Sequence, residues 1–288
     1  MHAIKVGQRL LDLTSPKIMG ILNITPDSFY DGGNYLSIPA AQKRVESLLE
    51  EGADVIDIGA YSSRPGAAEV SEAEELDRLL PILDALTSTF PEAIWSIDTF
   101  RSNVAKEAIA HGAHLINDIS GGDLDEDMFA TIAALQVPYI LMHMRGTPQT
   151  MQQQTDYADI VQDISLGFGR KVAELRKLGV KDIILDPGFG FAKTLEQNYQ
   201  LLDRVEELNV HGLPLLGAVS RKSMIYKRLG ITPAEALNGT TTLHTVLLLK
   251  GVKMLRVHDV PAARECIQLL EDFTHTRDLL ANEPHFLQ

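Results

Sequence analysis

The stretch Leu185-Asp186-Pro187-Gly188-Phe189-Gly190-Phe191 decides how we interpret the rest of the chain. It continues the apolar run Ile183-Ile184, which is typical of a buried parallel strand. Proline cannot donate a hydrogen bond to a strand ladder, and the glycines at positions 188 and 190 permit a sharp turn. The stretch therefore predicts a strand that ends in a carboxylate, Asp186. Taken alone, it is equally consistent with an ordinary turn after a strand.

The same arrangement recurs along the chain. Strand-like runs are predicted at residues 17–22, 55–58, 94–97, 114–116, 139–142, 183–185, 215–219 and 254–255. Helical patterns follow them at about residues 39–51, 76–83, 103–111, 129–135, 157–178, 195–208, 240–250 and 261–274, with Ser102 as a predicted N-cap. No linker-like segment separates the units.

Eight strand-helix units of this size predict a single α/β domain over residues 1–288, a (β/α)8 TIM barrel with its core at about residues 18–275. Residues 3–13 are expected to form a short N-terminal hairpin that closes one end of the barrel. An open doubly wound sheet is the alternative fold, but eight near-equal units favour closure into a barrel, for which about 250 residues is typical.

Composition limits the possible partners and the compartment. The chain has 26 Lys and Arg against 39 Asp and Glu, a net charge of -13, which disfavours nucleic-acid and anionic-membrane surfaces. Its single cysteine, Cys266, excludes an intramolecular disulfide and indicates a reducing compartment. No signal-peptide pattern occurs in the first residues and no apolar run is long enough for a membrane span. We therefore expect a cytoplasmic protein with no membrane partner.

In a TIM barrel the catalytic groups lie at the C-terminal ends of the strands. Here polar residues follow nearly every predicted strand, and turns alone do not account for so many of them. They are Asn23, Asp57, Ser63-Arg64, Asp98, Asn117, His143, Asp186, Ser220-Arg221-Lys222 and Arg256-Val257-His258. We interpret these positions as one shared site.

The chemistry of these residues falls into two groups. Asp98, Asn117 and Asp186 suit a ligand that presents a fork of N–H donors, such as an aminopyrimidine edge. The cationic residues suit a phosphorylated group, which barrels often hold after their last two strands. By charge, this second group comprises Arg64, Lys222, Arg256 and His258.

Other site types are disfavoured by missing motifs. The sequence has no GxGxxG after the first strand, no P-loop and no HExxH zinc pattern. Asn23 and Asp27 could help to bind Mg²⁺ together with substrate phosphates, since Mg²⁺ often takes only one or two protein oxygens. We favour a packing or hydrogen-bonding role for His143 over that of a base, because the sequence shows no partner for it.

Several of these motifs, in this order, closely resemble those of the dihydropteroate synthases over about residues 18–275. They are Asn23-Ile24-Thr25-Pro26-Asp27-Ser28-Phe29, Asp31-Gly32-Gly33, Ser63-Arg64-Pro65-Gly66, Asp98-Thr99, Asn117-Asp118, Met142-His143-Met144, Asp186 to Phe191, Ser220-Arg221-Lys222 and Arg256-Val257-His258-Asp259. The resemblance implies an enzyme of folate biosynthesis that joins hydroxymethyl-dihydropterin pyrophosphate to p-aminobenzoate and releases pyrophosphate with Mg²⁺. It also implies inhibition by sulfonamides and a homodimer formed through outer helices.

The resemblance also implies a role for each matching residue. The pterin site would comprise Asp98, Asn117, Met142, Asp186, Phe191 and Lys222, so Lys222 moves from the phosphate group to the pterin pocket. The pyrophosphate site would comprise Asn23, Arg64, Arg256 and His258, with Asn23 as the metal ligand. The p-aminobenzoate site would comprise Phe29, Ser63, Pro65, Phe189 and Ser223. The catalytic residues would be Asp98, Asp186, Lys222 and Arg256.

The chain departs from the family pattern at two places. The second loop reads Gly59-Ala60-Tyr61-Ser62-Ser63-Arg64-Pro65-Gly66, where Gly-Glu-Ser-Thr-Arg-Pro-Gly is common, and Ala192 stands where glycine is common. The first change leaves two alternatives to the synthase: a non-catalytic pterin-binding paralogue, and a barrel like the methyltetrahydrofolate methyltransferases. The Ser-Arg-Pro-Gly loop and the cationic site argue against the methyltransferase.

The expected reaction is a dissociative displacement. Pyrophosphate would leave first, and Asp98 and Asp186 would stabilise the resulting pterin-methyl cation. The aryl amine of p-aminobenzoate needs no strong base, because its nitrogen is already nucleophilic and can lose its proton after the new bond forms.

Overall fold

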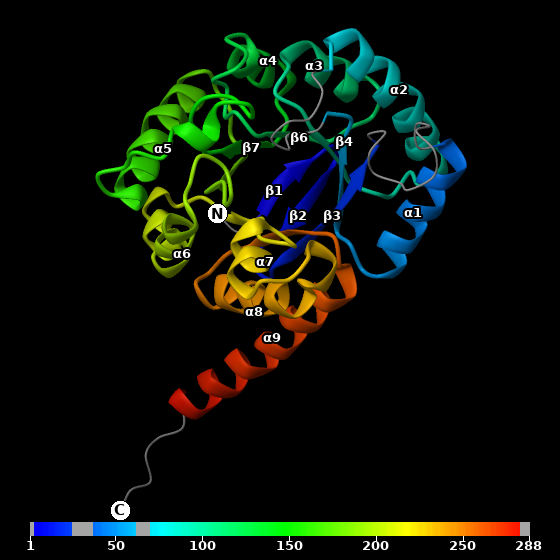
Figure 1. Ribbon diagram of the computed structural model, residues 1–288. Helices are drawn as coiled ribbons and strands as arrows, with labels where there is room; N and C mark the ends of the chain where they lie inside the picture. The colour runs from blue at the N-terminus through cyan, green and yellow to red at the C-terminus, as the bar shows by residue number, and fades with distance from the viewer. Residues whose placement is uncertain (1–2, 25–36, 62–69, 283–288) are drawn as a thin grey trace, which may run out of the picture.

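The computed structural model describes residues 3–24, 37–61 and 70–282, with side chains described as far as Phe273. Figure 1 shows a ring of helices around a central set of strands, with the last helix extending beyond the ring. The strands are parallel and run in the order β8-β7-β6-β5-β4-β3-β10-β9. An isolated parallel bridge between Leu185 and Leu215 joins the two edges of this sheet. The predicted (β/α)8 barrel is confirmed, and the open-sheet alternative is excluded.

The bounds of the elements are as follows. The barrel strands are β3 (Lys17–Asn23), β4 (Val55–Gly59), β5 (Trp95–Asp98), β6 (Leu115–Asp118), β7 (Tyr139–Met142), β8 (Ile183–Asp186), β9 (Leu216–Gly217) and β10 (Met254–Val257). The helices are α1 (Ile38–Glu50), α2 (Glu72–Thr89), α3 (Ser102–Ala110), α4 (Met128–Leu135), α5 (Ile160–Lys177), α6 (Leu195–Asp203), α7 (Ser223–Leu229), α8 (Leu237–Leu249) and α9 (Val260–Asn282). Short 3-10 turns occur at η2 (Met151–Gln153), η3 (Val205–His211) and η4 (Pro233–Glu235).

The predicted N-terminal hairpin is present as β1 (Ala3–Val6) and β2 (Arg9–Asp12), which pair antiparallel. Its apolar side chains Ile4, Val6 and Leu11 are buried in one cluster with residues from the lower half of the barrel, including Met19 and Val55. The hairpin therefore closes the N-terminal end of the barrel and leaves the opposite end for a site.

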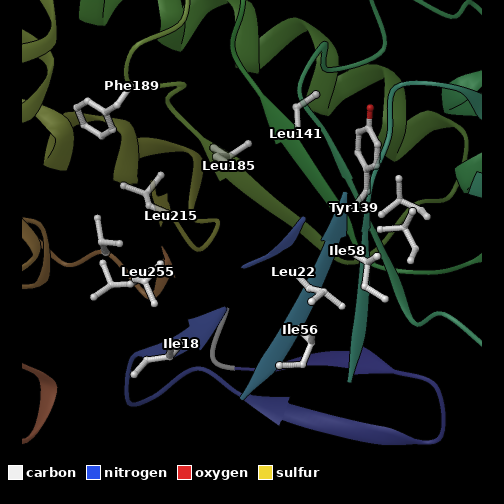
Figure 2. Packing of buried hydrophobic residues seen from close by; sticks show 14 of the residues in the cluster. Ile18, Leu22, Ile56, Ile58, Tyr139, Leu141, Leu185, Phe189, Leu215 and Leu255 are labelled. Carbon is white, nitrogen blue, oxygen red and sulfur yellow. The ribbon is translucent and has the colours of Figure 1, made fainter. Parts of the chain in front are cut away.

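A second and larger apolar cluster lies between the strands and the helices. Figure 2 shows part of it, including Ile18, Leu22, Ile56 and Leu185. Ile18 belongs to this outer cluster whereas its neighbour Met19 belongs to the inner one, because successive side chains of a strand point to opposite faces. Burial on both faces explains why these strands are almost continuously apolar.

The same alternation places the polar strand ends inside the barrel. Val55, Leu115, Ile184 and Met254 all belong to the inner cluster. Two residues further on, each strand returns to the same face with a polar side chain. These side chains are Asp57, Asn117, Asp186 and Arg256. The inner face thus changes from apolar to polar towards the C-terminal mouth.

Three predicted helix limits were wrong. Arg101, and not Ser102, is the N-cap of α3, because the Ser102 amide donates to the carboxylate of Asp125 at 2.6 Å. Helix α6 ends at Asp203 and gives way to η3, so the predicted helix to residue 208 is two elements. Helix α9 runs to Asn282 and is longer than its apolar pattern indicated.

His244 on α8 is expected to make the stability of the fold sensitive to acid. Its side chain is 2% exposed, and its Nε2 atom has no hydrogen-bond partner among the described residues. Burial lowers the pKa of His244 from 6.5 to about 4, against the opposing charge of Asp259. As pH falls from about 6.5 to about 4, the unfolded chain therefore binds a proton that the folded chain does not.

We expect this difference to cost about 3 kcal/mol of the free energy of unfolding across that pH window. His244→Leu should remove this part of the acid loss, which urea unfolding of the variant and the parent at pH 7 and pH 4.5 would measure. An identical loss in both proteins would show that His244 does not contribute.

Candidate functional site

A buried carboxylate, Asp57 on β4, organises the barrel mouth. It is completely inaccessible to solvent. Its Oδ1 accepts the Ser96 hydroxyl at 2.5 Å, and its Oδ2 accepts the Asn117 amide at 3.0 Å and Nε of Arg256 at 2.6 Å. One carboxylate thus orients side chains from three other strands.

Arg256 is held between two carboxylates. Besides its bond to Asp57, its Nη2 donates to Oδ2 of Asp98 at 2.7 Å. The Arg256 side chain is 18% exposed and these two bonds use only Nε and Nη2, so part of its fork remains open to a ligand. Burial and the neighbouring Asp57 charge raise the pKa of Asp98 to about 7, although Arg256 opposes the shift. The side chain of Asp98 therefore titrates near neutral pH.

Strand register brings the predicted polar residues together. Asn23 on β3 lies beside Gly59 on β4, Gly59 beside Asp98 on β5, and Asp98 beside Asn117 on β6. On the other side of the mouth, Met142 on β7 lies beside Asp186 on β8. Asn117 and Asp186 are each 3% exposed. These predicted residues, except those outside the described part, therefore face a common space.

Asp186 begins the loop that the sequence singled out. Its Oδ1 accepts the Gly188 amide at 2.8 Å, which turns the backbone back towards the strand end. Gly188 has φ +71°, and a Cβ there would lie 2.1 Å from the His143 carbonyl oxygen, so glycine is required. Burial raises the pKa of Asp186, and the Lys222 charge opposes this.

Lys222, just before α7, reaches across to the same loop. Its Nζ donates to the Phe189 carbonyl at 2.6 Å and lies 4.8 Å from the centre of the Phe191 ring. Burial lowers the pKa of Lys222 to about 8, and the Asp186 carboxylate opposes the shift. One bond to the protein leaves further N–H donors of the ammonium for a ligand.

The structure contradicts the predicted contact between the Phe189 ring and p-aminobenzoate. This side chain is 0% exposed and packs in the large apolar cluster, as Figure 2 shows. Phe191 follows Gly190, whose φ of +85° turns the backbone, and its ring is partly exposed beside Lys222. Phe191 is therefore the phenylalanine of this loop that can meet a ligand.

Two further predicted residues border the same space. Ser223, the first residue of α7, is partly exposed next to Lys222. Met142 is 3% exposed and belongs to a small apolar cluster with Met144 and Ala192. Ala192 has φ +50°, a left-handed conformation that explains why glycine suits this position, and its buried methyl group packs in that cluster.

His258 and Ser220 form a pair after the last two barrel strands. The His258 amide donates to the Ser220 hydroxyl oxygen at 3.2 Å, and this hydroxyl lies 3.0 Å from His258 Nδ1. The Arg44 guanidinium holds the His258 carbonyl at 3.2 Å. These contacts fix the imidazole at the edge of the mouth near Arg256.

A magnesium site would need oxygen donors. Within residues 3–24, 37–61 and 70–282, no three His, Cys, Asp or Glu side chains converge to hold a metal ion. The amide oxygen of Asn23 and Oδ2 of Asp98 both lie next to Gly59. They would be 3.5 and 3.7 Å, respectively, from a Cβ atom added to this glycine. One amide oxygen suits Mg²⁺ that arrives with substrate phosphates, which supply most of its ligands.

Several predicted residues lie outside the described residues. They are Asp27, Phe29, Ser63, Arg64 and Pro65. The described residues on either side of the second loop are nevertheless fixed. Arg101 forms an ion pair with buried Glu75, donates to the Val70 carbonyl at 2.6 Å, and lies 5.6 Å from the Tyr61 ring.

The sequence did not indicate two features of the site. Asp57 was included among the strand ends of the shared site, but nothing in its neighbours shows that side chains from three other strands bind it. Lys193 follows the Asp186 loop and has the appearance of a solvated lysine, yet it is 4% exposed. Its spacing of seven residues from Asp186 carries no signal of burial.

The chain is similar to known proteins over most of its length. The family model described as pterin binding enzyme matches residues 19–258. A dihydropteroate synthase from Escherichia coli strain K12 is 41% identical over 264 residues, covering 91% of this chain and 93% of that protein. One from Synechocystis is 45% identical over 270 residues, covering 92% and 93%.

Solved structures agree with these relatives. The Yersinia pestis dihydropteroate synthase with a sulfonamide drug complex has a TM-score of 0.90 at 40% identity, covering 95% of this chain and 99% of that one. The Thermus thermophilus dihydropteroate synthase in complex with 4-aminobenzoate has a TM-score of 0.85 at 38% identity, covering 94% and 99%. With its barrel, its polar mouth and this similarity over nearly its full length, the chain belongs to the dihydropteroate synthases, within the pterin-binding enzyme family.

Proposed function

We propose that the protein condenses hydroxymethyl-dihydropterin pyrophosphate with p-aminobenzoate and releases pyrophosphate. The observation that carries this proposal is the arrangement at the mouth. A buried carboxylate, Asp186, and a partly buried one, Asp98, face a common space that also holds the cationic Arg256. This arrangement suits a ligand that has an N–H-rich edge and an anionic leaving group.

The pterin would lie deep in the mouth. Asp186 and Asn117 would bind its donor edge, and a free N–H of Lys222 would bind its carbonyl. Asp98 would lie close to the ring, with Met142 and Phe191 as apolar walls. The p-aminobenzoate would lie further out, between Ser223 and the exposed side of Phe191. The related structures with 4-aminobenzoate and with a sulfonamide drug support both the substrate and sulfonamide inhibition.

Pyrophosphate would bind at the other side of the mouth. Arg256 presents the open part of its fork there, and His258 lies at the edge with Ser220. Asn23 would hold Mg²⁺ through its amide oxygen, together with the substrate phosphates, and Arg64 would add a further cation. Bound Mg²⁺ supplies positive charge that stabilises the departing pyrophosphate.

The residues of the site favour a dissociative displacement. The bond between the pterin methylene carbon and the pyrophosphate oxygen breaks first. Arg256 and His258 bind the phosphate that this step frees, which carries two negative charges. The carboxylates of Asp98 and Asp186 stabilise the cationic pterin because they are preorganised in a site with little water. The amine of p-aminobenzoate then attacks the methylene carbon and afterwards loses its proton.

Product analysis tests this function against the two alternatives. The protein should convert equimolar pterin pyrophosphate and p-aminobenzoate into dihydropteroate and pyrophosphate, as liquid chromatography with mass detection would show. Pterin binding without product would indicate a non-catalytic paralogue. Loss of the methyl group from added methyltetrahydrofolate would instead indicate a methyltransferase.

We also propose a cytoplasmic homodimer. None of the described helices is long and apolar enough to span a membrane. Apolar side chains are exposed on the outer helices, with Leu249 on α8 55% exposed and Leu269 and Phe273 on α9 71% and 55% exposed. Burial of such a surface is a common reason for self-association. A monomeric mass in light scattering at micromolar concentration would contradict the dimer.

A further inference from the structure

Lys193 is a buried cation for which the reaction proposed above gives no role. Its side chain is 4% exposed, which is rare for lysine. It lies between the Asp186 loop and the N-terminus of α6, whose cap is the next residue, Thr194. A lysine is expensive to bury, so it must gain specific contacts in return.

Lys193 has one hydrogen-bond acceptor for each of the three N–H donors of its ammonium group. Its Nζ lies 2.8 Å from the Gly188 carbonyl oxygen, 2.9 Å from the Phe191 carbonyl oxygen and 3.2 Å from Nδ1 of His143. An ammonium group has three donors and no acceptor, so three acceptors satisfy it completely. A neutral amine would leave one of these buried acceptors without a donor.

The partner His143 is suited to accept. Burial and the nearby Lys193 charge lower the pKa of His143 well below 6.5, so its ring is neutral. Its backbone amide donates to the Asp186 carbonyl at 2.9 Å, which fixes the imidazole next to the loop. This arrangement answers the question that the sequence left open: among the described residues, His143 has a hydrogen-bonding partner in Lys193.

The charges around Lys193 come from several elements. Asp186 at the end of β8 stabilises the ammonium, whereas Lys222 before α7 and Arg145 after β7 oppose it. Burial is the largest effect and lowers the pKa of Lys193 to about 7. The three hydrogen bonds favour the charged form in the folded protein.

The loop that Lys193 holds carries the Phe191 ring and also binds Lys222. Gly188 and Phe191, whose carbonyls bind Lys193, flank Phe189, whose carbonyl binds Lys222. Gly190 between them donates to Asn198 at 2.6 Å. Lys193 and Lys222 therefore bind carbonyls of the same short loop, which also carries the Phe191 ring.

We propose that Lys193 is a positioning residue of this synthase, which holds the 186–191 loop so that Asp186, Phe191 and Lys222 fit the pterin and p-aminobenzoate. It does not touch the substrates. Arg256 lies on β10 and His258 directly after it, so pyrophosphate binding should not depend on Lys193. The proposal rests on the synthase function and predicts a defect confined to one side of the site.

Lys193→Met keeps the apolar stem and removes all three donors. We expect about ten- to a hundredfold weaker binding of a pterin carboxylic acid, measured by calorimetry, and a similar loss in kcat/KM for p-aminobenzoate. The affinity for pyrophosphate should stay within about twofold of the parent. Lys193→Gln retains two donors, enough for the Gly188 and Phe191 carbonyls, and should show a smaller defect.

Arg264→Met is the matched control. Arg264 also holds a loop carbonyl, that of Gly52, and a carboxylate, Asp54 at 2.8 Å, but at the opposite end of the barrel. It should lose stability while its pterin affinity and kcat/KM stay within about twofold of the parent. All measurements are made at a temperature where circular dichroism shows folded protein.

The outcomes are distinguishable. Unchanged pterin affinity in both Lys193 variants, or an equal loss of pyrophosphate affinity, would overturn the positioning role. If Lys193→Met does not fold, the comparison of Lys193→Gln with the parent decides in the same way. A parent protein that binds pterin but forms no dihydropteroate would contradict the synthase function and leave the pterin-binding comparison valid.

Discussion

Asp57→Leu is expected to abolish dihydropteroate formation and to lower the free energy of unfolding by about 3–5 kcal/mol. The substitution leaves the Ser96 hydroxyl, the Asn117 amide and Nε of Arg256 without their buried acceptor. Arg256 would then keep only Asp98, and its open N–H groups would no longer be aimed at the leaving group. Urea unfolding and a product assay would measure both losses.

Ser96→Ala is the matched control for Asp57. It removes one of the three hydrogen bonds to the same carboxylate and should cost only about 1 kcal/mol, with most of the activity retained. Asp57→Asn should be intermediate, since it keeps the shape but not the charge. If Asp57→Leu retains parental kcat/KM, Asp57 does not position Arg256.

Asp98→Asn is expected to lower kcat by about 10²- to 10³-fold while the affinity for a pterin carboxylic acid changes by only a few fold. The amide keeps hydrogen-bonding capacity but lacks the charge that stabilises a cation. Asp84→Asn is the control, since this 57% exposed carboxylate lies on α2 and pairs with His111. A kcat for Asp98→Asn equal to that of the parent would remove Asp98 from the catalytic role.

The same carboxylate predicts a pH dependence. Its folded pKa is raised to about 7, so the ionised form is lost as pH falls through that value. Because only the carboxylate can stabilise the cation, kcat/KM of the parent should decline below about pH 7 with a slope of one proton. Asp98→Asn should lack this limb. Arg256 opposes the shift, so Arg256→Met should move the limb to higher pH.

The sequence was sufficient for the fold because the barrel is a local pattern repeated eight times. Each strand is buried on both faces and so forms an apolar run, and most strands have a polar residue at or just beyond their C-terminal end. Helix limits were less predictable, since they depend on contacts between elements. The Asp125 carboxylate that binds the amide of Ser102 is 23 residues away along the chain.

The site was predictable to the extent that it lies at strand ends. Asn23, Asp98, Asn117, Asp186 and Arg256 all face the mouth because the barrel rule and strand alternation place them there. The Phe189 assignment was wrong because the turn at Gly188 decides which of two nearby rings faces inward. The burial of Lys193 and the three hydrogen bonds to Asp57 depend on how separate elements meet in the fold. No spacing in the sequence indicates them.

Exchange of labelled pyrophosphate into the pterin pyrophosphate, with p-aminobenzoate absent, tests most directly whether the carboxylates of Asp98 and Asp186 stabilise a free pterin cation. If pyrophosphate departs first, the parent protein should incorporate the label at a rate comparable to kcat in the presence of Mg²⁺. Asp98→Asn should lose exchange and synthesis in parallel. Synthesis of dihydropteroate at full rate with no exchange would contradict the dissociative mechanism and the role of Asp98 and Asp186 in it.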